Sequence, residues 1–180
     1  MIRTIITYPD KRLFLRSQEV EDFGGELHTL LDDMYETMIE KNGIGLAAIQ
    51  VAVPKRALII NLPDEEGNQR PEELLELINP VILEERGSQV YTEGCLSIPD
   101  YYSDVERAEW VKVRYQDRYG KSHILEADGL LAVAIQHEID HLDGHLFIER
   151  LPYLKRKKFE KEFRKKRRSA QTTVRSSPGG

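Results

Sequence analysis

Apolar residues recur at spacings of three and four in two long segments, and this spacing predicts helices. In the segment 24–43, five apolar side chains have this spacing, and the pair Asn42-Gly43 supplies a signal that ends the helix. They are Leu27, Leu30, Leu31, Met34 and Met38. The segment 127–144 has an unusually apolar first half. We therefore expect an amphipathic helix over 24–43, packed on a core, and a second helix over 127–144 that suits a buried site.

Three shorter segments are rich in β-branched residues and predict strands. They are 56–62, 77–85 and 110–117. A polar loop, 63–73, separates the first two, and 116–123 has the composition of a hairpin turn. Together these elements predict a single compact α+β domain. In it, antiparallel strands surround the central helix 127–144, and further helices lie toward the N- and C-termini.

The composition is that of an ordinary soluble protein, with 180 residues of which 32% are charged and 40% hydrophobic. This length suits one domain with a substantial core. No apolar run approaches the ~18 residues that a membrane span needs, and the first residues contain no signal-peptide core. Cys95 is the one cysteine, so no intramolecular disulfide can form. We expect a cytoplasmic protein that does not contact a membrane.

Positive charge is concentrated near the C-terminus, although the net charge is −5. Residues 155–168 hold ten Lys or Arg and two Glu, a balance of +8, so the rest of the chain carries −13. Phe159 and Phe163 are four residues apart, which fits a basic helix with one apolar spot. A solvated charged helix is the simplest account, but such a stretch on an acidic protein favours an anionic partner. The small polar residues 169–180 predict a disordered tail.

The helix 127–144 contains His-Glu-x-x-His, a metal-binding pattern. His137 and His141 are four residues apart, so their imidazoles lie on one helix face and can hold one ion. Glu138 follows the first histidine and can reach a water molecule at the metal without being a ligand. The simpler alternative is a polar helix end whose histidines merely cap or pack, and the apolar first half of the helix disfavours it.

Two histidines do not complete a catalytic metal site, so a third protein ligand is required. The zinc-protease pattern HExxHxxGxxH matches through Gly144, but its third histidine falls on Phe147. His145 lies eight residues beyond His137, ~12 Å along a helix, so we interpret it as a surface residue. Another protease arrangement takes its third ligand from a glutamate downstream of the pattern. The acidic residues that follow in this chain are poorly suited to that role. These are Glu149, Glu160 and Glu162. The third ligand is therefore expected upstream.

The segment TEGCLSIPD (92–100) presents Cys95 between Gly94 and a short apolar stretch. A lone cysteine more often packs than reacts. Here, however, a thiolate with two imidazoles makes a good transition-metal site and leaves a fourth position open. Gly94 would let the backbone come close to the ion. We therefore expect Cys95, His137 and His141 to be the metal ligands.

A third segment, NGIGLAAIQV (42–51), has very small side chains and contains one polar amide near its end. A nucleotide-binding loop would need more glycine and a following Lys-Ser or Lys-Thr. A tight packing crossover explains the small residues equally well. The amide of Gln50 is harder to explain by packing, and it is a candidate donor to an oxyanion in a cleft.

The three segments, in this order, resemble the motifs of peptide deformylases, GxGLAAxQ, EGCLS and HExDH. They read here GIGLAAIQ (43–50), EGCLS (93–97) and HEIDH (137–141). The likeness continues through YPDKRL (8–13) and DDMYETM (32–38) and covers roughly residues 1–150. It implies a catalytic domain over 1–154, followed by the basic helix 155–168.

This resemblance implies a hydrolase that removes the N-formyl group from the N-terminal methionine of newly synthesised proteins and releases formate. Its substrates would be N-formyl-methionyl nascent peptides. Cys95, His137 and His141 would hold one divalent metal, Fe²⁺ by expectation, with Zn²⁺, Ni²⁺ or Co²⁺ as substitutes.

The resemblance also implies roles for other residues. Glu138 would be the general acid/base, and the backbone N–H of Leu96 and the amide of Gln50 would stabilise the oxyanion. The substrate peptide would pair with the backbone near Ile44 as an added strand, and its methionine side chain would enter an apolar pocket. The expected substrate-binding residues are Gly43, Ile44, Gly45, Gly94 and Val133.

Two places depart from the family pattern. Many members have an arginine shortly after EGCLS that contacts the peptide, where this chain has Tyr101 and Tyr102. A glutamate often precedes the first motif glycine, where this chain has Asn42. Neither departure touches the metal or oxyanion groups, so their effect falls on peptide residues beyond the methionine.

The basic segment 155–168 resembles, in position and charge, a C-terminal helix through which some bacterial deformylases bind the ribosome, so the ribosome is an expected partner. Two other functions are compatible with the sequence. A metalloprotease with an unrecognised ligand would keep its metal after Cys95→Ser. A non-enzymatic module that binds nucleic acid or the ribosome would be unaffected by Glu138→Gln.

Overall fold

A computed structural model describes the backbone of residues 1–176 and the side chains of residues 1–170. Residue contacts divide the chain into two units, Met1–Phe147 and a second that starts at Ile148. The first unit holds two antiparallel sheets and the helices α1 (Gly25–Glu40) and α2 (Gly129–Leu142), and the second holds α3 (Tyr153–Ser176). The predicted α+β class is confirmed. Among the described helices, none has the length and apolar character to cross a membrane.

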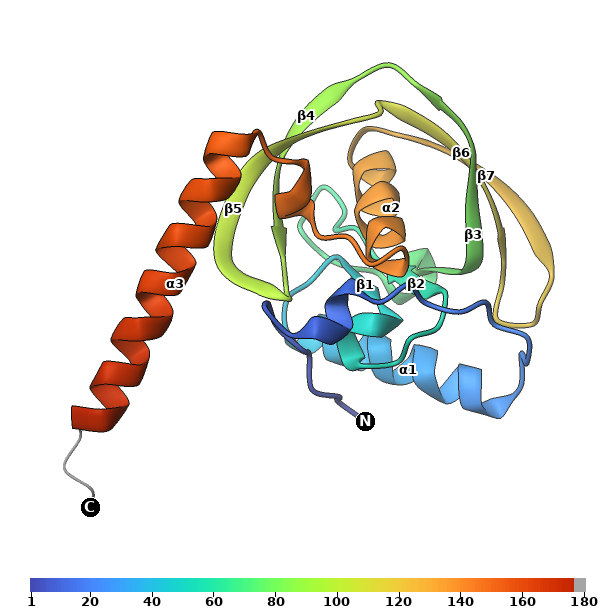
Figure 1. Cartoon of the computed structure of the whole chain (residues 1–180). Coiled ribbons are helices and arrows are strands. Elements are labelled where there is room, and N and C mark those ends of the chain that lie inside the picture. Colours follow the sequence, from blue (N-terminus) through green and yellow to red (C-terminus); the bar gives the residue numbers. More distant parts are fainter. Residues whose placement is uncertain (177–180) are drawn as a thin grey trace. The chain divides into compact units, whose positions relative to one another are not determined.

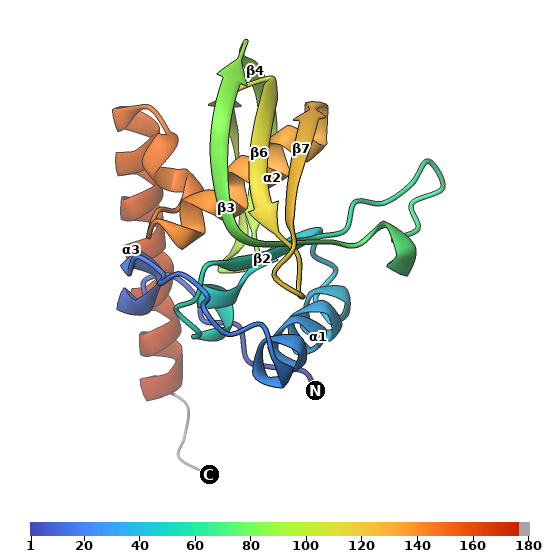
Figure 2. The same ribbon diagram turned by 90° about the vertical axis from the view of Figure 1, so that its right-hand side faces the viewer.

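The larger sheet has five strands in the order β1-β2-β3-β6-β7, with antiparallel pairing throughout. The smaller sheet pairs β4 with β5. The strands are β1 Gly45–Ala47, β2 Ala57–Ile60, β3 Leu75–Arg86, β4 Gln89–Cys95, β5 Ile98–Arg107, β6 Trp110–Gln116 and β7 Ser122–Asp128. Within the first unit, α2 lies inside the curve of the strands, and α1 lies on the other side of β1 and β2 (Figures 1 and 2).

The core of the first unit is built on β2, which is buried along its whole length. Side chains alternate between the two faces of a strand. Leu58 and Ile60 accordingly join the apolar cluster around α2, whereas Ala57 and Ile59 join the cluster around α1. Burial on both faces explains the unbroken apolar run of this strand. It also places the neighbouring edge strand β1 directly beside α2.

The predicted strands 56–62, 77–85 and 110–117 correspond to β2, β3 and β6, and the predicted hairpin turn joins β6 to β7. Short 3-10 helices lie at Lys11–Phe14, Ala48–Val51, Pro71–Glu73 and Phe147–Arg150.

The C-terminal helix is longer than the predicted segment 155–168. It begins at Tyr153 and ends at Ser176, so the chain is helical in the first part of the segment that was expected to be a disordered tail. The helix extends this far because no proline or glycine occurs between Tyr153 and Pro178. Residues 177–180 of that predicted tail lie outside the described residues.

Candidate active site

The His-Glu-x-x-His residues of α2 form one wall of the site. The rings of His137 and His141 are 5.1 Å apart between centroids, and Glu138 and His141 are almost fully buried. The Oε1 atom of Glu138 lies 3.9 Å from Nε2 of His137 and 4.0 Å from Nε2 of His141. These separations are too long for hydrogen bonds, so the carboxylate stands beside both imidazoles without being bound to either.

β4 brings Cys95 to the same point. The β4–β5 ladder is interrupted between Glu93 and Cys95, and Cys95 then pairs with Ile98 across a tight turn. Its Sγ lies 3.3 Å from Nε2 of His141, and the ligand atoms of Cys95, His137 and His141 all lie within 4.8 Å of one another. The three predicted ligands therefore converge. His145 is exposed and stands apart from this cluster, in line with the prediction.

The donor set fits a divalent transition metal. Metal–sulfur and metal–imidazole bonds of ~2.3 and ~2.0 Å place the ligand atoms of a tetrahedral site about 3.5 Å apart. The Cys95–His141 separation of 3.3 Å is close to that value. Three protein ligands also leave one position of a tetrahedral ion free, which is the arrangement of a catalytic rather than a structural site.

A buried ion-pair network orients His137. Oε1 of Glu93 lies 2.9 Å from Nδ1 of His137 and accepts its proton in a hydrogen bond. Arg107 donates to both oxygens of Glu93, at 2.6 and 2.9 Å, and to Asp140 at 2.9 Å. Burial opposes ionisation of Glu93, but the bonds from His137 and Arg107 outweigh it and lower the pKa of Glu93. Because Nδ1 is engaged, Nε2 of His137 is left to face the metal.

No role for Glu93, Arg107 or Asp140 is predicted from the sequence. Glu93 and Asp140 stand inside the motifs EGCLS and HEIDH, and this position was a signal that could have identified them. Arg107 stands outside every motif, and only the fold brings it between the two carboxylates.

Glu93→Gln is expected to weaken metal binding by about 10- to 100-fold, the usual cost of changing a group that orients a histidine ligand. The substitution keeps the shape of the side chain but removes the charge that fixes the His137 proton and balances Arg107. Competition with a chelator, followed by metal analysis, measures the change. The exposed Glu126 allows Glu126→Gln as a matched control. Equal metal affinity in both variants would contradict an orienting role for Glu93.

Gln50 lies in the 3-10 helix after β1 and points its amide nitrogen at the cysteine. Its Oε1 accepts from the backbone N–H of Ala47 at 2.9 Å, which fixes which end of the amide faces the site. Its Nε2 lies 3.5 Å from Sγ of Cys95 and donates to Oγ of Ser97 at 3.0 Å. The side chain is therefore buried, oriented and directed toward Cys95.

A cavity of about 430 Å³ opens onto these groups. One part of its lining is apolar. That part is formed by Ile44, Leu130, Val133 and Ala134. Gly43, Gly45, Gly94 and Leu96 also line the cavity, so all five predicted substrate-binding residues border it. Toward its mouth it meets Tyr91 and the exposed Tyr102.

Two glycines in the lining have side chains of other residues packed closely against them. A Cβ on Gly45 would lie 3.1 Å from the Glu138 carboxylate, so the absence of a side chain makes room for that group. A Cβ on Gly94 would lie 2.5 Å from the ring of Tyr102. We expected Gly94 to leave room for the ion. This expectation is wrong, because the space beside Gly94 is occupied by Tyr102.

Phe147 occupies the position where a zinc protease of the HExxHxxGxxH type has its third histidine. Its ring stacks on His137, with centroids 5.9 Å apart, and on Tyr101, with centroids 6.1 Å apart. Phe147 is almost fully buried. An aromatic wall therefore packs against His137 where that class of protease would have a ligand.

Burial controls the protonation of the groups on α2. It raises the pKa of Glu138 to about 7, although the positive charges of His137 and Arg107 act in the opposite direction. Burial, together with the charge of His137, lowers the pKa of His141 well below its ordinary value. His141 is therefore neutral, the form that binds metal, and Glu138 can both accept and release a proton near neutral pH.

The raised pKa of Glu138 predicts a pH-dependent stability in the metal-free protein. The unfolded carboxyl titrates near 4.5, and the folded one near 7, so folding takes up a proton between these values and stability falls as the pH rises. Glu138→Gln removes this loss. Its free energy of unfolding should therefore match the wild type at pH 4.5 and exceed it by about 3 kcal/mol at pH 8.5. Urea unfolding at both pH values tests this, and a gap that is independent of pH would refute it.

Comparisons with known proteins agree with this geometry. A family model described as polypeptide deformylase matches residues 2–157. The peptide deformylase of Nautilia profundicola is 63% identical over 161 residues, 89% of this chain and 92% of the relative. That of Campylobacter jejuni is 57% identical over 170 residues, 94% and 97% of the two chains.

Solved structures extend the agreement to the fold. A peptide deformylase from Legionella pneumophila superposes with a TM-score of 0.84 at 40% identity, covering 95% of this chain and 98% of that one. A class I type b peptide deformylase from Acinetobacter baumannii with bound Met-Ala-Ser has a TM-score of 0.78 at 35% identity, covering 84% and 99%. The chain thus belongs to the peptide deformylase family, the metal-dependent hydrolases that remove the N-formyl group from newly made peptides.

Proposed function

We propose that Cys95, His137 and His141 hold the divalent metal of this deformylase and that Glu138 transfers the protons of the reaction. The observation that carries the proposal is the convergence of the three ligand atoms within 4.8 Å, with a buried carboxylate beside them and an open cavity in front. Iron(II) is the metal we propose for the cell. Zinc, nickel and cobalt also suit a thiolate and two imidazoles.

The substrate peptide would lie along the free edge of β1. The carbonyl of Ile44 accepts from the N–H of Asn61, the residue directly after β2, so the backbone of Ile44 faces into the sheet. The backbone N–H and C=O groups of successive strand residues point to opposite edges of the strand. Those of Gly45 therefore point to the open edge. We propose that Gly45 pairs with the backbone of the substrate methionine. This refines the expectation that Ile44 and Gly45 would share the pairing.

The methionine side chain would enter the apolar part of the cavity. Ile44 is partly exposed there, and Val133 and Ala134 of α2 line the same region. Because Gly45 lies against Glu138, a methionine paired with Gly45 would have its formyl group at the metal ligands. The following peptide residues would then run toward Gly43 and Asn42.

The chemistry needs a base, an acid and donors to an oxyanion. A divalent metal bound by these ligands supplies the Lewis acidity that lowers the pKa of a water molecule toward ~7. Glu138 accepts the proton that the water loses as it attacks the formyl carbon. It then delivers that proton to the departing amine, which leaves formate and a free N-terminus.

The negative oxygen that forms during the attack would be stabilised by Gln50 and by the backbone N–H of Leu96. The amide of Gln50 is held by Ala47 on its oxygen side, so its nitrogen faces the reaction before the substrate arrives. Donors that are fixed in advance stabilise a developing charge without having to reorient. Leu96 follows the ligand Cys95 directly, which keeps its N–H beside the same centre.

Release of formate from formyl-Met-Ala-Ser by protein purified without oxygen tests this function. We expect one equivalent of metal and rapid release of formate. The cramped surroundings of the formyl group, with Gly45 against Glu138, predict that acetyl-Met-Ala-Ser reacts far more slowly. If both peptides react alike, the proposed selectivity fails, and if metal-loaded protein yields no formate, the proposed reaction fails.

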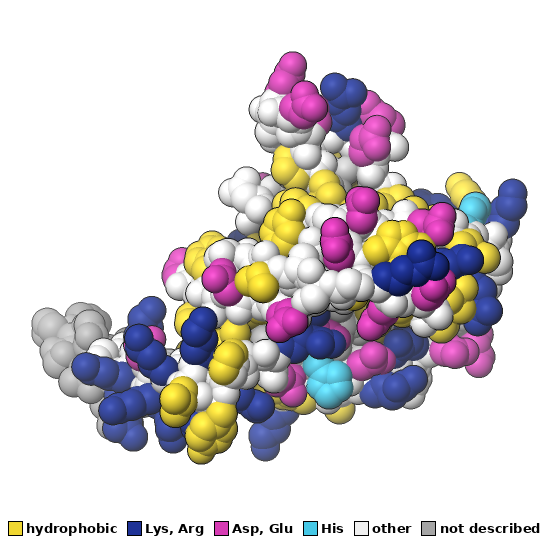
Figure 3. Space-filling view, turned by 90° about the horizontal axis from the view of Figure 1, so that it is seen from above, with side chains coloured by type: hydrophobic (Ala, Val, Ile, Leu, Met, Phe, Trp, Pro, Cys, Tyr) yellow, Lys and Arg dark blue, Asp and Glu magenta, His cyan; other side chains and the backbone are white. Residues whose placement is uncertain are grey.

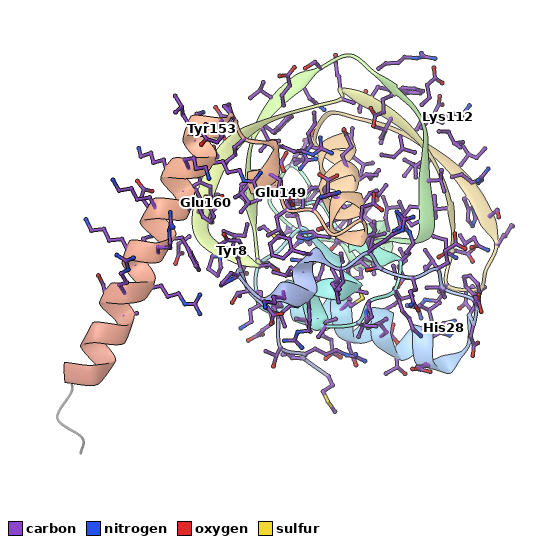
Figure 4. All side chains as sticks on the ribbon, in the orientation of Figure 1. Tyr8, His28, Lys112, Glu149, Tyr153 and Glu160 are labelled. Atoms are coloured by element: carbon purple, nitrogen blue, oxygen red, sulfur yellow. The ribbon has the colours of Figure 1, made fainter. Side chains whose placement is uncertain are left out.

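We further propose that α3 binds the ribosome and that the enzyme acts in the cytoplasm, where nascent chains and a free thiol such as Cys95 are found. Figure 3 shows mainly Lys and Arg side chains on the segment next to the grey residues. Glu160, labelled in Figure 4, pairs with Arg156 and Lys157, both at 3.4 Å. The balance of +8 over 155–168 already includes the charge of Glu160, so α3 retains strong attraction for phosphate groups.

Ending the chain at residue 154 should abolish binding to ribosomes while leaving formate release from short peptides within about twofold of the wild type. The full chain should lose affinity steeply as salt rises, because bound phosphates release counterions. Sedimentation with ribosomes at two salt concentrations measures both effects. Undiminished binding by the truncated protein, or binding that is insensitive to salt, would refute the role of α3.

A further inference from the structure

The loop between β2 and β3 reaches back to the strand edge that the substrate would use. The amide nitrogen of Gln69 donates one hydrogen bond to the carbonyl of Gly43, at 2.9 Å, and another to the carbonyl of Asn61, at 2.7 Å. Gly43 directly precedes the Ile44–Asn61 backbone pair. Both hydrogens of one amide group therefore join the two backbones just beyond the end of the β1–β2 ladder.

The loop is itself held on both sides of Gln69. The side chain of Asn61 donates to the carbonyl of Arg70 at 2.9 Å. Asp64 accepts from the backbone of Asn68 at 2.9 Å and pairs with Arg70 at 3.0 Å. Gln69 is consequently placed by its neighbours on either side, so its contact with Gly43 does not depend on a freely moving side chain.

Gly43 is held at its N–H by a hydrogen bond to the carbonyl of Met38, at 2.9 Å, and at its carbonyl by Gln69. Glycines stand on both sides of Ile44, and glycine restricts the backbone least. A Cβ at Gly43 would lie 2.7 Å from the Leu96 side chain, which would have to shift to admit it. The bond from Gln69 to the Gly43 carbonyl thus supports a segment whose own residues restrict it little.

Position along the edge determines which substrate residues depend on Gln69. Gly45 lies at the catalytic end, because its Cα is next to Glu138. Gly43 is two residues farther, and an extended peptide advances at nearly the same rate as the strand it pairs with. The methionine would therefore lie beside Gly45, and the second residue after it would lie beside Gly43.

We propose that Gln69 is a positioning residue that fixes the distal half of the substrate edge, so that peptides gain affinity once they extend two residues beyond the methionine. Gln69 does not line the cavity and acts through the Gly43 backbone. The inference rests on the proposed function, because it assumes that the peptide runs along β1 from Gly45 toward Gly43.

The test compares formyl-Met-Ala with formyl-Met-Ala-Ser on the metal-loaded enzyme. Gln69→Glu keeps the shape of the side chain but removes both donors, and Gln69→Ala removes the side chain. We expect KM for the three-residue peptide to rise about fivefold to tenfold in both variants, the effect of losing one or two hydrogen bonds. We expect kcat to be unchanged and KM for formyl-Met-Ala to change by less than about twofold. Asn68→Ala, next to Gln69 on the exposed loop, is the control and should behave as the wild type.

An equal rise in KM for both peptides, or no rise for either, would overturn the proposal. Amide hydrogen exchange supplies a readout that does not depend on catalysis. Gln69→Glu should speed exchange at the N–H of Asn61, which bonds to Ile44, and should leave α2 unaffected. Unchanged exchange at Asn61 would likewise count against the proposal. Absence of formate from the wild type with both peptides would instead defeat the proposed function, and the exchange result would still decide the role of Gln69.

Discussion

Glu138→Gln should reduce formate release by about 1,000-fold or more while the protein still binds one equivalent of metal. The amide has nearly the shape of the carboxylate but can neither take the proton from water nor return it to the amine. Proton transfer by a positioned side chain contributes 10²–10⁴-fold to such reactions. Glu138 is not within hydrogen-bonding distance of either histidine Nε2, so its replacement leaves the three ligands in place.

The same chemical change on the surface gives the control. Glu126 is exposed on β7, so Glu126→Gln should retain full activity and full metal content. Steady-state formate release and elemental analysis of the same samples measure both quantities. Wild-type activity in Glu138→Gln would favour a non-enzymatic binding module, for which the carboxylate has no task. Loss of metal together with activity would show that Glu138 supports the metal site, contrary to its proposed role.

Cys95→Ser should lose both metal and activity. The thiolate is one of the three proposed protein ligands, and a serine hydroxyl is a poor substitute for it at a transition metal. Changing a residue that merely orients a ligand costs 10–100-fold in metal affinity, so removing a ligand should cost more than about 100-fold. Serine is almost the same size as cysteine, and the turn that carries Cys95 should therefore keep its shape.

His145→Ala is the matched comparison for that experiment. His145 follows α2 closely but is exposed and stands outside the metal cluster, so its removal should change neither metal content nor rate. If Cys95→Ser retained its metal and lost it only when His145 was replaced, the site would be of the protease kind that takes its third ligand after the His-Glu-x-x-His pattern. The stacking of Phe147 on His137 argues against that arrangement.

The elements that the sequence predicts are those with a regular pattern of burial. α1 and α2 place their apolar residues at helical spacing, and β2 is apolar on both faces. β4 and β5 escaped prediction because few of their side chains are buried, so neither strand shows a clear alternation of apolar and polar residues. β1 escaped because it has three residues and lies in a segment of small side chains, where packing and strand structure give the same pattern.

The residues of the site likewise divide into those that the sequence predicts and those that only the fold brings together. The ligand types and their spacing along one helix indicate a metal, because periodicity alone places His137 and His141 together. The ion pairs of Arg107 with Glu93 and Asp140 connect residues 14 and 33 positions apart, and no local pattern encodes such a pairing. The hydrogen bonds of Gln69 depend in the same way on how the loop folds back.

The free edge of β1 has a consequence for solubility. An unpaired strand edge is a template on which other chains can add, and long exposed edges promote aggregation. β1 spans only Gly45–Ala47, with Asn42 in a left-handed conformation before it and a 3-10 helix directly after it. Such an edge is long enough to align a few residues of an extended peptide. It is shorter than a typical strand of about five or six residues, and very short edge strands are poor templates for growth of an intermolecular sheet.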